Sequence, residues 1–209
     1  MDMKKLGTIN LSGKVVVSDP CYDRDVWCMQ DDIAVKAGNY HVYVSYSDEK
    51  EFGTRVAALA VVHTDHLDLL SDGHLNWNSV NGSIGVDSGQ CGIFDDSIYP
   101  RGTKADEDAE VFDSFYQECC NITGSEEQGG ILKSGKGVVT SSGFGDGGYE
   151  LFSLSHKNET VALLVDYSVT TMRDIMRALV AESSKPDSSA KCRKNVIFTT
   201  QQFVLPFAA

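Results

Sequence analysis

Several features that direct a chain to a membrane, to nucleic acid or to an oxidising compartment are missing here. No apolar run approaches the roughly 20 residues of a membrane helix, and no apolar segment typical of a secretory signal follows the first lysines. Basic residues number 18 against 30 acidic ones, and the net charge of -12 argues against general affinity for nucleic acid or anionic membranes. The six cysteines form no Cys-x-x-Cys pair, so neither a zinc ribbon nor a disulfide framework is indicated.

The remaining composition is typical of a soluble globular protein. A chain of 209 residues with 42% hydrophobic residues is long enough to bury one substantial core. We expect a cytoplasmic protein, because unpaired cysteines suit a reducing compartment, and we expect most of them to be small buried residues. The acidic surface suits solubility, cations or a basic protein partner.

Strand patterns dominate the chain. Residues 14–20 are a β-branched run that ends at Asp-Pro, and residues 55–64 are apolar on both faces, as in a central strand. Residues 39–47 alternate, which places one set of side chains on a single face: Tyr40, Val42, Val44 and Tyr46. Further strands are predicted in "SIGVDSGQCGIFD", "GVVTSSGF", "YELFSLSH", "TVALLVDYS" and "NVIFTTQQFVLPF".

Two segments have helical periodicity. In the first, residues 105–120, the predicted apolar stripe consists of Ala109, Phe112, Tyr116 and Cys119. In the second, residues 170–182, Thr171 and Asp174 form a capping pair, and the stripe consists of Met172, Ile175, Met176, Leu179 and Val180. We predict an α+β fold, a mainly antiparallel sheet or sandwich with two covering helices. Residues 1–182 would form one β-rich domain, and residues 183–209 a polar linker plus a terminal strand packing on that domain.

Three turns carry aspartate beside small residues. Asp19 ends the first strand, Asp87 and Asp95 lie in "GVDSGQCGIFDD", and Asp146 lies in "SSGFGDGGYELF". In each case an apolar run ends in a sharp turn that carries an aspartate, and small neighbouring residues leave its carboxylate uncovered. Carboxylates gathered at strand ends would suit calcium or magnesium, or a general acid and base. Aspartate and glycine are also the commonest turn formers, so each turn has an equally simple structural interpretation.

The segment from Gly143 to Gly148 matches the letters G-x-G-x-x-G. A dinucleotide site needs a helix after that loop, whereas "YELFSLSH" is a strand pattern, and the other kinase motifs are missing. We therefore interpret this segment as a glycine-rich hairpin that presents Asp146.

Histidines and cysteines offer two weaker alternatives. His63, His66, Asp68 and His74 could bind zinc, but residues three apart lie on opposite faces of a strand, and surface histidines near a turn are favoured. Cys21 and Cys91 lie within the aspartate turns, where neighbouring acids should make a thiol harder to ionise.

Three aromatic side chains near turns have two possible roles. They could line a pocket for a flat ligand or form edges of the core: Trp27, Trp77 and Phe144.

Three blocks of the sequence follow one another in the order "VSDPCYD", "GVDSGQCGIFDDSIY" and "SGFGDGGYELF", and "RVAALAVV" lies between the first two. Together they resemble the uncharacterised bacterial and phage family catalogued as domain of unknown function 4241. The resemblance covers about residues 15–167. It brings no established activity, and because relatives occur near toxin–immunity or defence genes, it permits an interaction role. The residues it implies are Asp19, Pro20, Asp87, Ser88, Gly89, Asp95, Gly145, Asp146, Gly147 and Tyr149.

These patterns predict a binding domain whose site is built from the aspartate turns. Its ligand would be a divalent cation, such as calcium or magnesium, or a small polar molecule with donors or positive charge; the predicted metal ligands are Asp19, Asp87 and Asp146. The further ligand-binding residues are Ser88, Gly89, Asp95, Gly145 and Tyr149. Two alternatives stay open: an interaction factor of immunity or anti-defence type whose acidic surface meets a basic partner, and a metal-assisted hydrolase with an aspartate or His63 as base.

Overall fold

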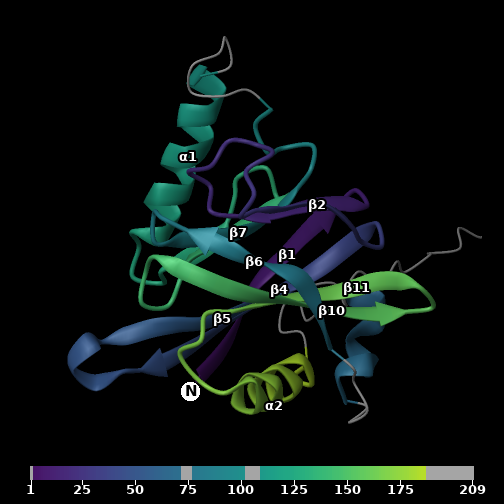
Figure 1. Cartoon of the computed structure of the whole chain (residues 1–209). Coiled ribbons are helices and arrows are strands. Elements are labelled where there is room, and N and C mark those ends of the chain that lie inside the picture. The colour runs from purple at the N-terminus through teal and green to yellow at the C-terminus, as the bar shows by residue number, and fades with distance from the viewer. Residues whose placement is uncertain (1, 72–76, 102–108, 187–209) are drawn as a thin grey trace, which may run out of the picture.

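Two antiparallel sheets pack face to face in the computed structural model, which describes residues 2–71, 77–101 and 109–186 (Figure 1). The larger sheet has the strand order β1 (Asp2–Leu11), β4 (Gly38–Asp48), β5 (Thr54–His63), β11 (Glu159–Asp166), β10 (Gly147–His156) and β6 (Asn78–Val86). The smaller sheet has the order β3 (Gln30–Ala34), β2 (Lys14–Ser18), β7 (Gln90–Asp95), β9 (Gly137–Ser141) and β8 (Gly129–Ile131). The predicted α+β architecture is confirmed.

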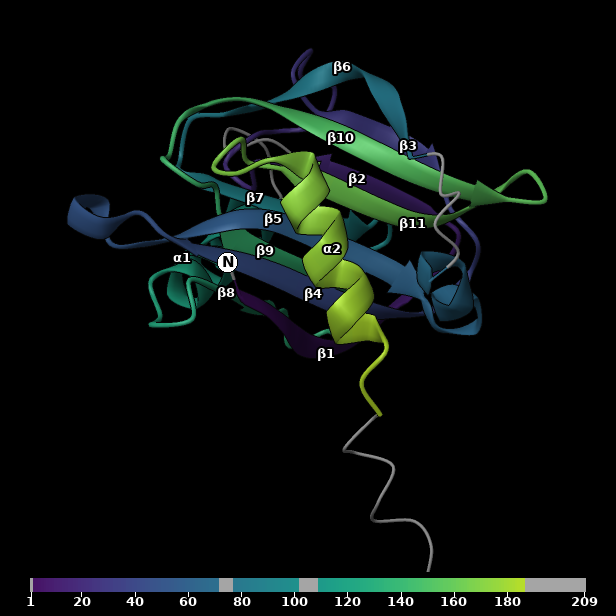
Figure 2. The same cartoon turned by 90° about the horizontal axis from the view of Figure 1, so that it is seen from below.

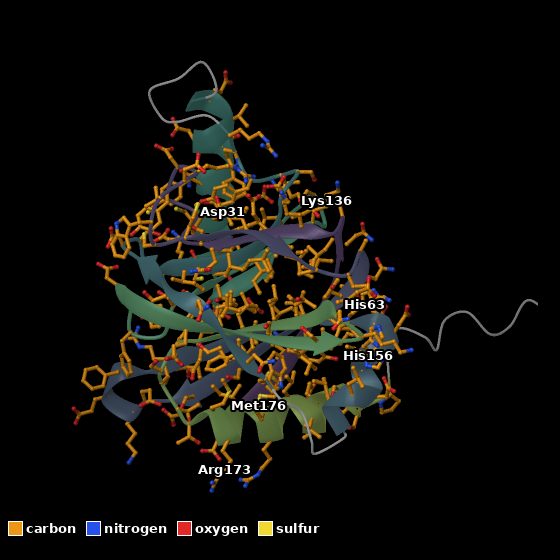
Figure 3. All side chains as sticks on the ribbon, turned by 45° about the vertical axis from the view of Figure 1, so that its right-hand side comes forward. Asp31, His63, Lys136, His156, Arg173 and Met176 are labelled. Atoms are coloured by element: carbon orange, nitrogen blue, oxygen red, sulfur yellow. The ribbon has the colours of Figure 1, made fainter. Side chains whose placement is uncertain are left out.

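Each sheet has a helix on its outer face. Helix α1 (Ala109–Thr123) covers the smaller sheet, and α2 (Met172–Ser183) lies across the larger one (Figure 2). Thr171 caps α2, since its hydroxyl oxygen accepts a hydrogen bond from the Asp174 N–H at 3.3 Å. Met176 lies on the side of α2 that faces the sheet and Arg173 on the outer side (Figure 3). The predicted stripe of α2 is confirmed.

Strand alternation divides the buried side chains between the layers. On β2, Val15 and Val17 enter the core between the sheets, whereas Val16 packs beneath α1. The central strand β5 is buried on both faces: Leu59 and Val61 point into the inter-sheet core, and the alternate residues face α2. The predicted common face of β4 is confirmed, because Tyr40, Val42 and Val44 are core residues and Tyr46 packs against them.

Three sequence predictions need correction. On α1 the predicted stripe is confirmed for Cys119 and wrong for Tyr116, because Phe115 and Ile122 pack on the smaller sheet with Cys119; the side chains of Ala109 and Phe112 lie outside the part that the structure describes. Residues 143–148 are not a hairpin, because β9 and β10 belong to different sheets and the segment crosses between them. Strands β1, β3 and β8 were not predicted. The proposed terminal strand within 187–209 lies outside the described residues.

In the ranges that the structure describes, no helix has the length and apolarity required to span a bilayer.

Two short 3₁₀ helices complete the described elements. Helix η1 (Lys50–Phe52) lies at the tip of the β4–β5 connection, and η2 (Thr64–Ser71) follows β5.

Candidate functional site

The three aspartate turns meet at one place, which we name the turn junction (residues 19–28, 87–89 and 142–148). The backbone N–H groups of Asp87 and Ser88 donate to the Asp19 carboxylate at 2.9 and 2.7 Å. The Ser142 N–H donates to the Gly89 carbonyl at 3.0 Å, and Gly147 pairs with Val86 where β10 meets β6. Segments that stand more than fifty residues apart in the chain are therefore held together, by backbone pairing and by the Asp19 carboxylate.

Asp19 is the buried centre of the turn junction. Its side chain is fully buried, and its carboxylate also accepts hydrogen bonds from the Cys21 N–H at 2.9 Å and the Ser88 hydroxyl at 2.6 Å. Four donors from two separate turns thus surround a single carboxylate. Hydrogen bonds to an ionised acceptor are the strong ones, so Asp19 acts as a clamp between the turns.

Asp95 has an equivalent arrangement, but at the opposite end of the β2–β7 pair. Val15 pairs with Asp95, whereas Ser18 pairs with Gly92, so the chain places Asp19 and Asp95 at different ends. The buried Asp95 carboxylate accepts from the Ser12 N–H at 2.5 Å and the Ser97 N–H at 3.1 Å. Burial opposes its ionisation, but the hydrogen bonds from Ser97 and Ser12 outweigh burial and lower the pKa of Asp95. Asp95 does not join the turn junction.

Tyr149 anchors the turn that carries Asp146. The buried phenol donates toward the carbonyl oxygens of Ser142 at 2.8 Å and Gly145 at 2.6 Å. The Ser142 hydroxyl also donates to the Gly145 carbonyl at 2.9 Å. Tyr149 and Gly145 therefore shape the site from within, while the Asp146 side chain stays exposed at the tip.

A hollow of about 350 Å³ opens beside the turn junction, between the loop after β2 and the paired ends of β6 and β10. Asp87 lies on its wall with an exposed side chain, and Trp27 is 89% exposed. Burial, and then a hydrogen bond to the Asp87 carboxylate, raise the pKa of the Tyr22 phenol, so that phenol stays neutral. The hollow is lined by Tyr22, Val26, Trp27, Cys28, Ser83, Gly85, Val86, Asp87, Gly147 and Gly148.

The loop after β2 is held against β6 by a close backbone approach. The Gly85 N–H donates to the Cys28 carbonyl at 2.8 Å, and a Cβ at Gly85 would lie 2.8 Å from the Cys28 Cβ. Only glycine leaves room for this contact. At its other side the loop is pinned by Arg24, whose guanidinium lies 2.7 Å from the Asp96 carboxylate. The loop that carries Tyr22 and Trp27 is thus held by contacts at Arg24 and at Cys28.

The predicted metal ligands are brought to one region but not to one coordination sphere. The described residues contain no group of three or more His, Cys, Asp or Glu side chains placed to hold a metal ion. The Asp19 oxygens face N–H and O–H donors, which point their hydrogens where a cation would lie. Asp146 is exposed at the turn tip and does not line the hollow. This arrangement favours a ligand that contacts Asp87.

The two cysteines of the aspartate turns have raised thiol pKa values. Burial, and then the charge of Asp19, raise the pKa of Cys21 to about 12, and the same two causes raise the pKa of the buried Cys91 to about 12. A thiol of this kind stays protonated at neutral pH. The charge of Asp19 acts in the direction expected from the neighbouring acids, but burial is the larger cause of both raised pKa values.

The histidines form a cluster elsewhere, at the other ends of β5 and β10. The rings of His63 and His66 are 5.3 Å apart, and those of His66 and His156 are 5.1 Å apart; His63 and His156 lie on the same side of the molecule (Figure 3). The prediction of surface histidines is wrong for His63, which is 3% exposed. Asp68 is exposed, and His74 lies outside the described residues.

Two larger hollows lie apart from the predicted site residues. One, of about 510 Å³, adjoins α1 and includes Phe115 and Leu132; the other, of about 610 Å³, adjoins α2 and includes Lys5 and His41. Neither is lined by any of the predicted site residues. Sequence reasoning missed Tyr22 and Ser83 as lining residues, although Tyr22 stands three residues after Asp19 in the turn that it did single out.

Comparisons of the chain with protein-family models, with curated protein sequences and with solved structures each returned no match. The resemblance to domain of unknown function 4241 therefore stays a prediction.

Proposed function

We propose that this chain is a binding domain that takes a small polar ligand with a positive charge into the hollow at the turn junction. The observation that carries the proposal is that Asp87 and Trp27 line the same hollow. A carboxylate attracts an organic cation directly, and an aromatic face attracts it through the ring quadrupole. Gly147 and Gly148 line the same hollow without side chains, which leaves room for a ligand beside Asp87.

Charge supports a cationic ligand over an anionic one. The whole chain carries a formal net charge of -12, which raises the local concentration of cations. Among the described residues Asp87 forms no ion pair with a lysine, arginine or histidine. Its carboxylate therefore keeps acceptor capacity toward the hollow, beside the hydrogen bond with Tyr22.

The site geometry gives a divalent cation and metal-assisted hydrolysis less support. Both need several oxygen or nitrogen ligands converging on one point, and Asp87 has no second carboxylate among the residues that line the hollow. The free thiols of Cys21, Cys28 and Cys91 support a reducing compartment such as the cytoplasm.

The test is a titration with L-arginine amide, choline and calcium chloride, monitored by calorimetry. We expect arginine amide or choline to bind wild type and Asp87→Asn to weaken that binding by about tenfold or more, which corresponds to about 1.4 kcal/mol. The matched control is Asp68→Asn, which removes the same charge from an exposed position on η2 and should leave the affinity unchanged. Equal affinities of the two variants, or no binding of either organic cation, would overturn the proposal. Calcium binding that is lost in Asp87→Asn would restore the divalent cation as the ligand.

A further inference from the structure

Exposed aromatic side chains gather around the turn junction. Four large hydrophobic side chains are exposed in the described part of the chain: Trp27, Phe52, Val111 and Phe144, at 89, 64, 58 and 56%. Val111 lies on α1, whereas Trp27 lines the hollow, Phe144 belongs to the turn junction and Phe52 contacts Phe144. We name Trp27, Phe52 and Phe144 the aromatic rim. Large exposed aromatics are enriched where proteins bind one another.

The rim is continuous with the hollow. The ring of Phe52, on η1, lies 6.0 Å from that of Phe144 in an edge-on contact. Phe144 belongs to the crossing segment that leads directly into Gly147 and Gly148, which line the hollow with Trp27. The β4–β5 connection and the start of β10 lie at the same end of the molecule in both ribbon views (Figures 1 and 2).

The charges around the rim are mainly negative. Asp87 and Asp146 are exposed on two of the turns, and in the part of the chain that the structure describes neither forms an ion pair. The tip that carries Phe52 adds Asp48, Glu49 and Glu51 against Lys50 and against Arg55, which lies beside Phe144. An apolar surface edged by carboxylates is complementary to a basic protein segment, since opposite charges steer the two surfaces together.

One ring of the rim already lies beside a guanidinium of the same chain. The guanidinium carbon of Arg55 lies 5.8 Å from the centroid of the Phe144 ring. A guanidinium is planar, stacks on aromatic rings and pairs with carboxylates through two hydrogen bonds, whereas an ammonium is a compact, strongly hydrated charge. Aromatic rings beside carboxylates therefore discriminate arginine from lysine at equal charge.

We infer that the aromatic rim and the hollow together bind an arginine-rich segment of a basic protein partner, with one arginine side chain at Asp87. This inference rests on the proposed function and names its ligand class. The hollow supplies the specific pocket, and Phe52 and Phe144 supply the surface that the neighbouring residues of the partner cover.

The experiment measures fluorescence anisotropy of labelled oligo-arginine and oligo-lysine peptides of equal length at physiological salt. We expect wild type to bind oligo-arginine about tenfold more tightly than oligo-lysine, and Phe144→Ala and Phe52→Ala each to lose most of that preference. Val111→Ala is the matched control, an equally exposed apolar side chain on α1, and should keep wild-type affinity. All rim residues to be changed are exposed, so the variants should fold.

Titration of the same variants with L-arginine amide separates the two proposals. If the amide binds wild type and Phe144→Ala equally and Asp87→Asn weakly, the hollow functions as proposed. Equal binding of the two peptides, or equal oligo-arginine affinity of Phe144→Ala and Val111→Ala, would then overturn the inference alone. If arginine amide fails to bind wild type while choline binds, the inference alone is overturned; if neither cation binds, the proposed small-ligand site is itself excluded.

Discussion

Ser88 binds the carboxylate of Asp19 twice, through its backbone N–H at 2.7 Å and through its hydroxyl at 2.6 Å. The two residues stand 69 positions apart in the chain. This contact joins the loop after β2 to the turn between β6 and β7, and so it holds the two walls of the hollow at a fixed separation. The aspartate that the sequence suggests as a ligand is therefore a structural clamp, and the exposed Asp87 beside it is the group available to a ligand.

Asp19→Asn should destabilise the fold, because the amide nitrogen of asparagine would face donors that now point at an ionised oxygen. We expect the free energy of unfolding to fall by about 3 kcal/mol, measured by urea denaturation. Asp25→Asn makes the same chemical change at an exposed position of the same loop and should cost less than about 0.5 kcal/mol. Equal midpoints for the two variants would show that the clamp contributes nothing.

Gly143→Ala should cost more than Gly135→Ala, although both glycines have left-handed backbone angles, with φ of +57° and +67°. Both variants incur backbone strain of about 1 kcal/mol. At Gly143 the new Cβ would also lie 2.9 Å from a methyl carbon of Val169 and 3.0 Å from the Tyr167 carbonyl, whereas nothing lies within 4 Å at Gly135. We expect an additional loss of about 1–3 kcal/mol for Gly143→Ala in thermal or urea unfolding. A loss no larger than that of Gly135→Ala would contradict the packing of the crossing segment.

The histidine cluster should make stability depend on pH. Burial, and then the charge of Lys36, lower the pKa of His66 below 6.5; His63 and His156 act in the same direction, and Asp65 opposes them. As pH falls below 6.5, the unfolded chain takes up this proton before the folded chain does, so the folded state loses stability until His66 is also protonated in it. We expect the free energy of unfolding to decrease between about pH 7.5 and 5, and His66→Gln to flatten that profile. An unchanged profile in His66→Gln would contradict this assignment.

Local patterns in the sequence were sufficient for most of the fold. Alternation in β4, apolar content in β5 and the stripe on α2 each report on the faces that those elements bury. Strand β1 was missed because its alternation is interrupted: the pairing with β4 shifts between Lys5 and Gly7. Met3 consequently packs on the α2 side, while Ile9 enters the inter-sheet core. The α1 stripe was misassigned because Tyr116 and Phe115 are both aromatic, and the smaller sheet decides which of them packs inward.

The candidate site was harder to predict, because its roles depend on contacts between distant turns. The pattern around Asp19, Asp87 and Asp146 indicated acids on turns, and these turns do meet. That Asp19 faces inward and Asp87 outward depends on the Ser88 contact, which no local pattern encodes. The exposure of Trp27 depends similarly on the loop being pinned by Arg24 and Asp96.

The most direct measurement is a map of amide chemical-shift changes in the isotope-labelled protein on titration with L-arginine amide. We expect the changes to fall on residues 22–28, 83–88 and 147–148, the segments around the hollow, and to be lost in Asp87→Asn. Changes confined to the α1 or α2 hollows, or a spectrum that does not change at all, would contradict a ligand site at the turn junction.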